Sequence, residues 1–345
     1  MRKLSLLVIA LLMLTVVPAF AQEATPEAAL PTLAELVVAS STAETPEFTL
    51  LLTAVQAADP AVLEALSSPD SDLTVFAPTD AAFLALQEAI GEEAFAEVLA
   101  DPEMLTSILL YHVMGDGAAK SEDLIAGLSM VGGTVSAPTL QGQAVDVVLT
   151  EEGGITVDGA NVVTADIEAS NGIVHVIDAV ILPETRTIAE IVVESAADAE
   201  APQFATLLAA VQAADPAVLE LLSDAEASVT VFAPTDEAFA AVGEETLTAV
   251  LADQALLTSI LQYHVVPSIV RPFSVLQDMD MMTAAMGEDG LSLDSALEGQ
   301  PLNIKVGMGE EGLTITVNEA NVIVTDVDAA NGVIHVIDAV LLPPQ

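Results

Sequence analysis

The sequence contains no cysteine and no tryptophan, and aromatic residues make up only 3% of its 345 residues. Without cysteine the chain can form no disulfide, no thiol nucleophile, no zinc–thiolate site and no lipid-modified cysteine. Hydrophobic residues still make up 53% of the chain, so it can bury substantial cores. Those cores must be held together by the packing of alanine, valine, leucine and isoleucine.

Basic residues are also scarce, with 6 lysines and arginines against 52 aspartates and glutamates, and the formal net charge is −46. A surface this negative repels phosphate, and Lys120, Arg186, Arg271 and Lys305 are too scattered to form a basic patch. Adsorption to anionic lipid is disfavoured for the same reason. The charge therefore argues against nucleic acids and membrane surfaces as partners.

The N-terminus has the three parts of a secretory signal peptide. Met1–Lys3 is positively charged, Leu4–Val17 is apolar, and Ala19–Ala21 has the small-x-small pattern of a cleavage site. A membrane-spanning helix would need ~20 apolar residues. We therefore predict a signal peptide over residues 1–21, a secreted mature chain with no membrane span, and a flexible lead-in over residues 22–31.

The rest of the chain repeats itself. The run AVQAADPAVLE occurs at Ala54–Glu64 and again at Ala210–Glu220, and the other shared blocks follow in the same order at offsets close to 156 residues. A period of this length is too long for a solenoid unit and matches a whole domain. We predict two domains, 32–183 (the first repeat) and 187–343 (the second repeat).

Each repeat begins with helical patterns and ends with strand patterns. Asp59–Pro60 and Asp101–Pro102 each pair a capping carboxylate with a proline suited to the first helical position. Strands rich in valine and isoleucine follow later, and Asn171–Gly172 between two of them is typical of a hairpin. The expected strands of the first repeat are Leu73–Phe76, Ala144–Leu149, Ile155–Val157, Ala160–Ile167 and Ile173–Leu182. Helices first and strands later predict an α+β domain with a largely antiparallel sheet.

Three blocks in a fixed order resemble the fasciclin (FAS1) domain family. They are TVFAPTD-x-AF, then Tyr-His, then an NG turn followed by HVIDAV and Leu-Pro, and together they span nearly the whole mature chain. The blocks lie at Thr74–Phe83, Tyr111–His112 and Asn171–Pro183, and again at Thr230–Phe239, Tyr263–His264 and Asn331–Pro343. The resemblance implies a wedge-shaped β-sandwich flanked by helices in each repeat, and an extracellular adhesion or matrix role without catalysis.

All four histidines lie inside the repeated blocks. His175 and Asp178 have a spacing that could suit a metal or an acid–base pair, as do His335 and Asp338. Residues three apart in a strand point to opposite faces, so we expect a structural role instead. We assign the same role, hydrogen bonding within the fold, to the other repeated polar residues. These are Thr79, Asp80, Tyr111 and His112 in the first repeat, and Thr235, Asp236, Tyr263 and His264 in the second.

No recognisable enzyme signature occurs in the sequence. It has no G-x-S-x-G, H-E-x-x-H or phosphate-binding glycine motif, and acidic pairs such as Glu151–Glu152 lie beside glycine in turn-like contexts. We therefore expect no catalytic, cofactor-binding or metal-binding residues. The many carboxylates leave room for weak calcium binding at the surface, although no EF-hand spacing is present.

A possible partner contact precedes the last block of each repeat. In some animal members of the family this segment carries short integrin-recognition motifs built around Asp-Ile. The matching positions here are Asp166–Ile167 and Asp326–Val327. The glutamate and proline of one such motif are missing, and the other interpretation is an ordinary strand edge.

The sequence thus favours a secreted, non-enzymatic protein that binds an extracellular protein or polysaccharide surface through two fasciclin-like domains. The alternative is a carrier of an apolar small molecule, such as a lipid or a pigment. A core of small aliphatic residues with few aromatics could leave an apolar pocket for such a ligand.

Overall fold

The computed structural model describes residues 30–42, 46–115, 117–131, 133–198, 203–271, 283–287, 289–309 and 312–344. The predicted signal peptide over residues 1–21 lies outside the described residues, as does the lead-in up to residue 29. From Pro31 onward the chain forms one compact unit.

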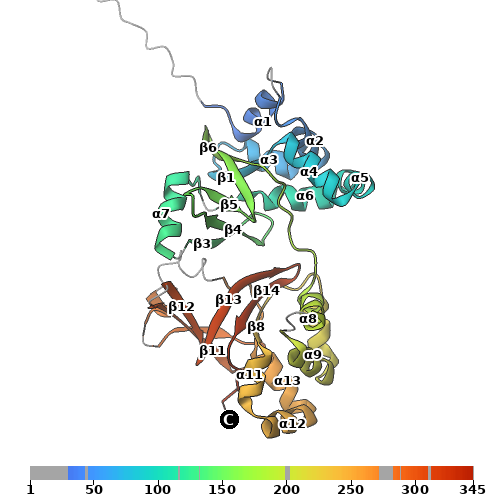
Figure 1. Ribbon diagram of the computed structural model, residues 1–345, viewed down its shortest axis with the longest axis vertical. Coiled ribbons are helices and arrows are strands. Elements are labelled where there is room, and N and C mark those ends of the chain that lie inside the picture. The colour runs from blue at the N-terminus through green and yellow to red at the C-terminus, as the bar shows by residue number, and fades with distance from the viewer. Residues whose placement is uncertain are drawn as a thin grey trace, which may run out of the picture. The chain divides into compact units, whose positions relative to one another are not determined.

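The first repeat begins with three helices and ends with strands (Figure 1). Its helices are α1 (Leu33–Ser41), α2 (Thr49–Ala57), α3 (Pro60–Ser67), α4 (Asp80–Ile90), α5 (Glu92–Ala100), α6 (Pro102–Tyr111) and α7 (Ser121–Val131). Its strands are β1 (Leu73–Pro78), β2 (Val113–Met114), β3 (Thr134–Pro138), β4 (Ala144–Leu149), β5 (Ile155–Val157), β6 (Ala160–Ala169) and β7 (Gly172–Ile177).

The second repeat has the same order of elements as far as it is described. Its helices are α8 (Ile188–Ala197), α9 (Ala205–Ala213), α10 (Pro216–Ser223), α11 (Asp236–Val242), α12 (Glu244–Ala252) and α13 (Gln254–Tyr263). Its strands are β8 (Val229–Pro234), β9 (Val265–Val266), β10 (Leu291–Asp294), β11 (Pro301–Gly309), β12 (Gly312–Val317), β13 (Ala320–Ala329) and β14 (Gly332–Ile337).

Each repeat contains one seven-stranded sheet. The strand order is β2-β1-β7-β6-β5-β4-β3 in the first repeat and β10-β11-β12-β13-β14-β8-β9 in the second. Neighbouring strands are antiparallel except for β1 with β7 and β8 with β14, which are parallel. Helices and a mostly antiparallel sheet in each of two tandem domains confirm the predicted α+β class.

Helices α3 and α6 begin where the sequence predicted. Asp59 and Asp101 are N-caps whose carboxylates accept backbone N–H groups, and proline follows each at the first helical position. Proline lacks the N–H that would go unpaired there, so it fits this position without losing a hydrogen bond.

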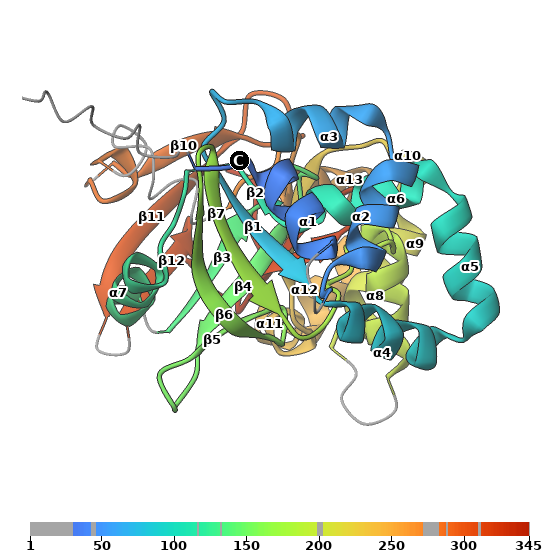
Figure 2. The same cartoon turned by 90° about the horizontal axis from the view of Figure 1, so that it is seen from above.

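Strands β1 and β7 separate two hydrophobic cores. Every residue of both strands is buried, because helices cover one face and the remaining strands cover the other. Along β1, Val75 and Ala77 pack with α1 to α6, whereas Phe76 packs with β4, β5 and helix α7. Figure 2 shows α1 to α6 on one side of these strands and α7 on the other. The second repeat has the same two cores.

The predicted hairpin at Asn171–Gly172 joins β6 to β7, and it is packed more tightly than a surface turn. Gly172 has φ +154°, and a Cβ there would lie 2.2 Å from the Leu73 carbonyl oxygen. The buried Asn171 side chain accepts a hydrogen bond from Leu33 N–H and donates to the Leu66 and Ser68 carbonyls. The hairpin therefore holds the start of α1 and the end of α3 in place.

One expected strand is shorter in the structure. The valine- and isoleucine-rich run predicted to reach Leu182 leaves the sheet after Ile177. Beyond that point the Ile181 N–H donates to a histidine side chain instead of a neighbouring strand. The apolar pattern continues beyond Ile177 because Ile181 is buried in the core that also contains β4, β5 and α7. It does not continue because the strand itself is longer.

Within the described residues, no single helix is both long and apolar enough to cross a membrane, and α2 with α3 meets that test only as a pair bent by 119°.

Candidate functional site

The repeated Tyr-His pair lies at the end of α6, and both side chains are buried. The Tyr111 hydroxyl is 2.9 Å from the Ala144 carbonyl oxygen and 2.7 Å from an Asp158 carboxylate oxygen. Burial, together with the nearby Asp158 carboxylate, raises the pKa of Tyr111 far above its ordinary value. In the second repeat the Tyr263 hydroxyl contacts the Pro301 carbonyl at 3.2 Å and accepts from the Asn318 amide. Each hydroxyl joins a helix end to the sheet.

Both nitrogens of His112 form hydrogen bonds within the fold. Nδ1 lies 2.8 Å from the Ile108 carbonyl and Nε2 accepts from Ile181 N–H, which assigns the proton to Nδ1. His264 makes the same two contacts, with Ile260 and Leu341. Burial lowers the pKa of both imidazoles to about 4, so they are neutral at physiological pH.

The second histidine of each repeat uses the opposite tautomer. His175 Nε2 lies 2.9 Å from the Ala119 carbonyl, and Nδ1 accepts from the Asp166 N–H at 3.3 Å. His335 makes the matching contacts, with Nε2 2.8 Å from the Val270 carbonyl and Nδ1 3.1 Å from the Asp326 nitrogen. Burial lowers the pKa of His175 and brings that of His335 to about 4.

The aspartates three residues after these histidines have other partners. Asp178 accepts from both the backbone N–H and the side-chain amide of Asn161, each at 2.8 Å. Asp338 holds Asn321 in the same way, at 2.8 and 2.7 Å. The exposed Asp178 and the buried His175 thus serve different contacts, and the structure does not bring them together as an acid–base pair.

Thr79 and Asp80, which lie within the first block, cap two different helices. Thr79 is the N-cap of α4, with its hydroxyl accepting from Ala82 N–H. Asp80 instead accepts from the Thr49 hydroxyl and the Leu50 N–H, at 2.5 and 2.8 Å, and so caps α2. The sequence predicted that both residues form hydrogen bonds within the fold, but it did not indicate that they serve two different helices. Thr235 and Asp236 of the second repeat repeat this arrangement, the former bonded to Ala238 and the latter to Ala205 and Thr206.

The possible partner contacts lie in an irregular part of β6 and β13. Asp166 and Asp326 have positive φ, 62° and 58°, at a point where the register with the neighbouring strand shifts. Ile167 and Val327 point inward. Each is partly buried against the core that packs between the sheet and the helices of its repeat. The branched apolar residue of each Asp-Ile-like motif is therefore partly covered by its own repeat.

The surroundings of these two aspartates differ between the repeats. Asp166 is exposed and accepts from the N–H and the hydroxyl of Ser121. Asp326 is only 5% exposed and lies 3.6 Å from Arg271, whose own side chain is 3% exposed. Burial raises the pKa of Asp326 to about 7, and Arg271 only partly offsets that effect.

A second ion pair occupies matching positions on the same strands. Lys120 pairs with Glu168 in the first repeat, where both side chains are about half exposed. Arg271 pairs with Asp328 in the second repeat, where the arginine is buried. Sequence reasoning treated Lys120 and Arg271 only as scattered charges, although each follows the residue whose carbonyl bonds the second histidine of its repeat.

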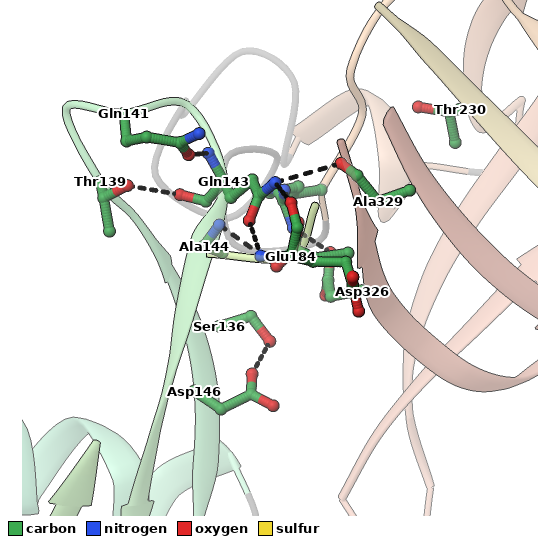
Figure 3. A network of polar contacts seen from close by, with 12 residues as sticks. Ser136, Thr139, Gln141, Gln143, Ala144, Asp146, Glu184, Thr230, Asp326 and Ala329 are labelled. Atoms are coloured by element: carbon green, nitrogen blue, oxygen red, sulfur yellow. Dashed lines mark hydrogen bonds and ion pairs between the residues drawn. The ribbon is translucent and has the colours of Figure 1, made fainter. Parts of the chain in front are cut away.

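The two repeats meet through a small polar network around Gln143 (Figure 3). The Gln143 amide pairs with both backbone groups of Glu184, at 2.7 and 2.8 Å, and also reaches the Ala329 carbonyl at 3.3 Å. The Ala144 N–H donates to Asp328 at 3.3 Å. The first repeat therefore contributes directly to the surroundings of the buried Arg271 cluster. Sequence analysis missed Gln143, whose position in a turn between two strands gives no signal.

The geometry provides no cluster suited to a metal in the described part of the chain, where no three His, Asp or Glu side chains converge. The repeated polar residues are hydrogen-bonded to backbone groups and to other polar side chains of their own repeat. The described part of the chain also has exposed apolar side chains and a hollow of about 210 Å³ beneath helix α7.

Comparison with known proteins gives a consistent result. A family model described as the fasciclin domain matches residues 46–183 and 202–343. Protein sll1483 of Synechocystis is 45% identical over 156 residues, which cover 45% of this chain and 74% of that protein. Transforming growth factor-beta-induced protein ig-h3 of Sus scrofa is 30% identical over 272 residues, covering 78% of this chain but only 34% of that protein. This chain thus spans about a third of the length of ig-h3.

Among solved structures, a FAS1 domain pair from the insect cell adhesion molecule fasciclin I aligns with 87% of this chain and 98% of its own length. Its sequence identity is 22% and its TM-score is 0.38. The assignment therefore relies on the family model, which matches each repeat separately and covers most of the chain. The chain belongs to the fasciclin domain family and contains the domain twice.

Proposed function

We propose that this protein is a secreted, non-enzymatic adhesion or matrix-interaction protein. Membership of the fasciclin family supports the class, and the leader-like N-terminus supports export. The acidic surface restricts its partners to neutral or cationic surfaces, or to acidic ones bridged by calcium.

The observation that carries this proposal is a set of exposed apolar side chains that recurs at matching positions of both repeats. Isolated exposed apolar residues are common on proteins, but here the shared sequence of the two repeats makes the chain present the same exposed apolar positions twice. Each of these side chains is at least 40% exposed. The pairs are Val38 and Val193, Leu63 and Leu219, Met104 and Leu256, Val163 and Ile323, and Leu182 and Leu342.

Two of these pairs lie on helices that pack against each other. Leu63 is on α3 and Met104 is on α6, and the Asp59 N–H at the start of α3 bonds to Thr106 of α6. The second repeat matches this with Leu219 on α10 and Leu256 on α13. We assign the partner contact to this helix pair, which the chain presents twice, so two weak contacts combine on one surface.

Retention on surfaces tests the proposal. Purified protein lacking residues 1–21 is applied to cell-wall polysaccharide, matrix protein and whole cells at physiological salt, with and without calcium. We expect retention on at least one surface and a loss of at least tenfold when Leu63, Met104, Leu219 and Leu256 are all changed to aspartate.

The control is Leu84→Asp, because Leu84 is exposed but its counterpart in the second repeat is an alanine, Ala240. This change should leave retention intact. Failure to be retained on any surface, or equal loss in the control, would contradict the proposal.

A second candidate function, carriage of an apolar small molecule, is favoured by one observation, the hollow beneath α7. Native mass spectrometry of protein purified from its source tests it. A stoichiometric bound molecule would support carriage, and ligand-free protein throughout would argue against it.

A further inference from the structure

A hollow of about 210 Å³ lies between helix α7 and the sheet of the first repeat. Leu124, Gly127 and Leu128 form its roof on one face of α7. Figure 1 shows α7 beside β3 and β4, the strands that close the hollow from below. It is therefore a space within one fasciclin domain.

The floor of the hollow is apolar and made of short side chains. Val135 and Ala137 come from β3, and Val147 from β4 pairs directly with Val135. Ala137 and Val147 are almost fully buried. These residues offer no hydrogen bonds that would hold water in place, and a cavity of about 150 Å³ with such a lining is large enough to bind benzene.

Gly127 is an exposed residue that lines the hollow without a side chain. It lies inside a helix, where glycine is less favourable than alanine, and a Cβ there would meet no atom within 4 Å. A larger side chain at this position would therefore stabilise the helix, and because Gly127 lines the hollow we expect that side chain to occupy part of it. The helix thus has a glycine, which is less favourable for helix formation than alanine, at a residue that lines the hollow.

The charge at the mouth limits what can enter. The polar side chain among the lining residues is that of Asp123, an exposed acid in the first turn of α7. Its carboxylate, together with a net charge of −46, opposes an anionic head group at this position.

We propose that the hollow beneath α7 binds a small uncharged apolar molecule, of the size of one substituted ring or a short alkyl chain. The inference rests on the carrier function offered above as a second candidate and gives it a site. A hydroxyl group on the ligand would lie at the mouth, where Asp123 can accept its hydrogen bond.

The experiment titrates the whole mature protein with n-octanol and with octanoate, which share an alkyl chain and differ in charge. Methyl NMR reports where they bind. We expect octanol to shift the methyl signals of Leu124, Leu128, Val135 and Val147, and octanoate to bind at least tenfold more weakly.

Two substitutions on α7 provide a matched pair. Gly127→Leu should fill the hollow and weaken octanol binding at least tenfold, whereas Ala126→Leu adds the same side chain at an exposed neighbouring position and should leave binding unchanged. Gly127→Ala, the smaller change, should weaken binding less than Gly127→Leu and raise the melting temperature, and it serves if the leucine variant does not fold.

Several results would overturn the proposal. They are no methyl shift up to the solubility of octanol, shifts away from the hollow, equal loss in the Ala126→Leu protein, or equal binding of octanol and octanoate. None of them would affect the surface-retention test, since that test depends on helices α3, α6, α10 and α13.

Discussion

At the scale of single residues, the repeated polar side chains are used inside the fold. His112 and His264 each connect a helix carbonyl to the chain after the last strand, and both ring nitrogens are occupied. A buried imidazole with a lowered pKa must stay neutral for the domain to be stable. These residues therefore stabilise the fold.

The first prediction concerns His112→Phe. The change leaves the Ile108 carbonyl and the Ile181 N–H unpaired in a buried place, so we expect the first repeat to lose about 2–4 kcal/mol of unfolding free energy at pH 7. Urea unfolding followed by NMR signals of each repeat measures this. His264→Phe should produce the same loss in the second repeat only.

The same variant has a defined pH dependence. The folded-state pKa of His112, about 4, lies below the ordinary 6.5, so its contribution to stability is complete above pH 6.5 and is lost as the pH falls toward 4. The wild-type protein should therefore lose part of its advantage over His112→Phe between pH 6.5 and pH 4. A difference that stays constant over this range would contradict the assignment.

At the scale of elements, the patterns that depend on neighbouring residues were predictable. Helix starts at Asp59 and Asp101, the hairpin at Asn171–Gly172 and the strands β4 and β5 follow from capping, turn chemistry and apolar runs. Contacts between segments far apart in the sequence could not be predicted. Asp80 caps α2, a helix that begins 31 residues earlier, and no local pattern indicates that partner.

The second prediction concerns the hairpin glycine. Gly172→Ala would place a Cβ against the Leu73 backbone, which cannot move without breaking the β1–β7 pairing, and we expect a loss of about 2–4 kcal/mol. Gly153→Ala is the control, because Gly153 also has positive φ, 82°, but a Cβ there meets open space. Thermal unfolding should show a clearly smaller loss in the control, and equal losses would mean that backbone strain alone matters.

At the scale of the whole molecule, the sequence predicted two domains of one family but not how polar groups link them. The repeated sequence blocks are enough to indicate two domains without any structure. The Gln143 amide reaches Ala329 of the second repeat, and the Ala144 N–H of the first repeat donates to Asp328, which pairs with the buried Arg271. Gln143 and Arg271 both lie outside the repeated blocks, so the repeat pattern gave no indication of these contacts.

The third prediction concerns this buried cluster. Asp326 faces Arg271 and Asp328 from its own repeat and Asp146 from the first. Its pKa is raised to about 7, so the native state is favoured at low pH and loses stability as the pH rises from the ordinary 3.8 through about 7. Asp326→Asn keeps the Arg271–Asp328 pair and should raise the unfolding free energy at pH 8 by about 1–3 kcal/mol, with little gain near pH 4.

The control for this prediction is the same change in the first repeat. Asp166 is exposed and accepts two hydrogen bonds from Ser121, so Asp166→Asn should lower stability at pH 8 instead of raising it. Calorimetry at pH 8 and pH 4 compares the two variants. Stability changes of the same sign in the two variants would show that the burial of Asp326 does not explain the difference between the repeats.

The central claim is that the histidines common to both repeats are neutral structural residues and not reactive or metal-binding groups. Nitrogen NMR of the four imidazoles, followed from pH 8 to pH 5 with and without added zinc, tests it most directly. We predict an Nδ1–H tautomer for His112 and His264, an Nε2–H tautomer for His175 and His335, and no response to zinc. Titration of any of the four near pH 6.5, or a zinc-dependent shift, would contradict the account.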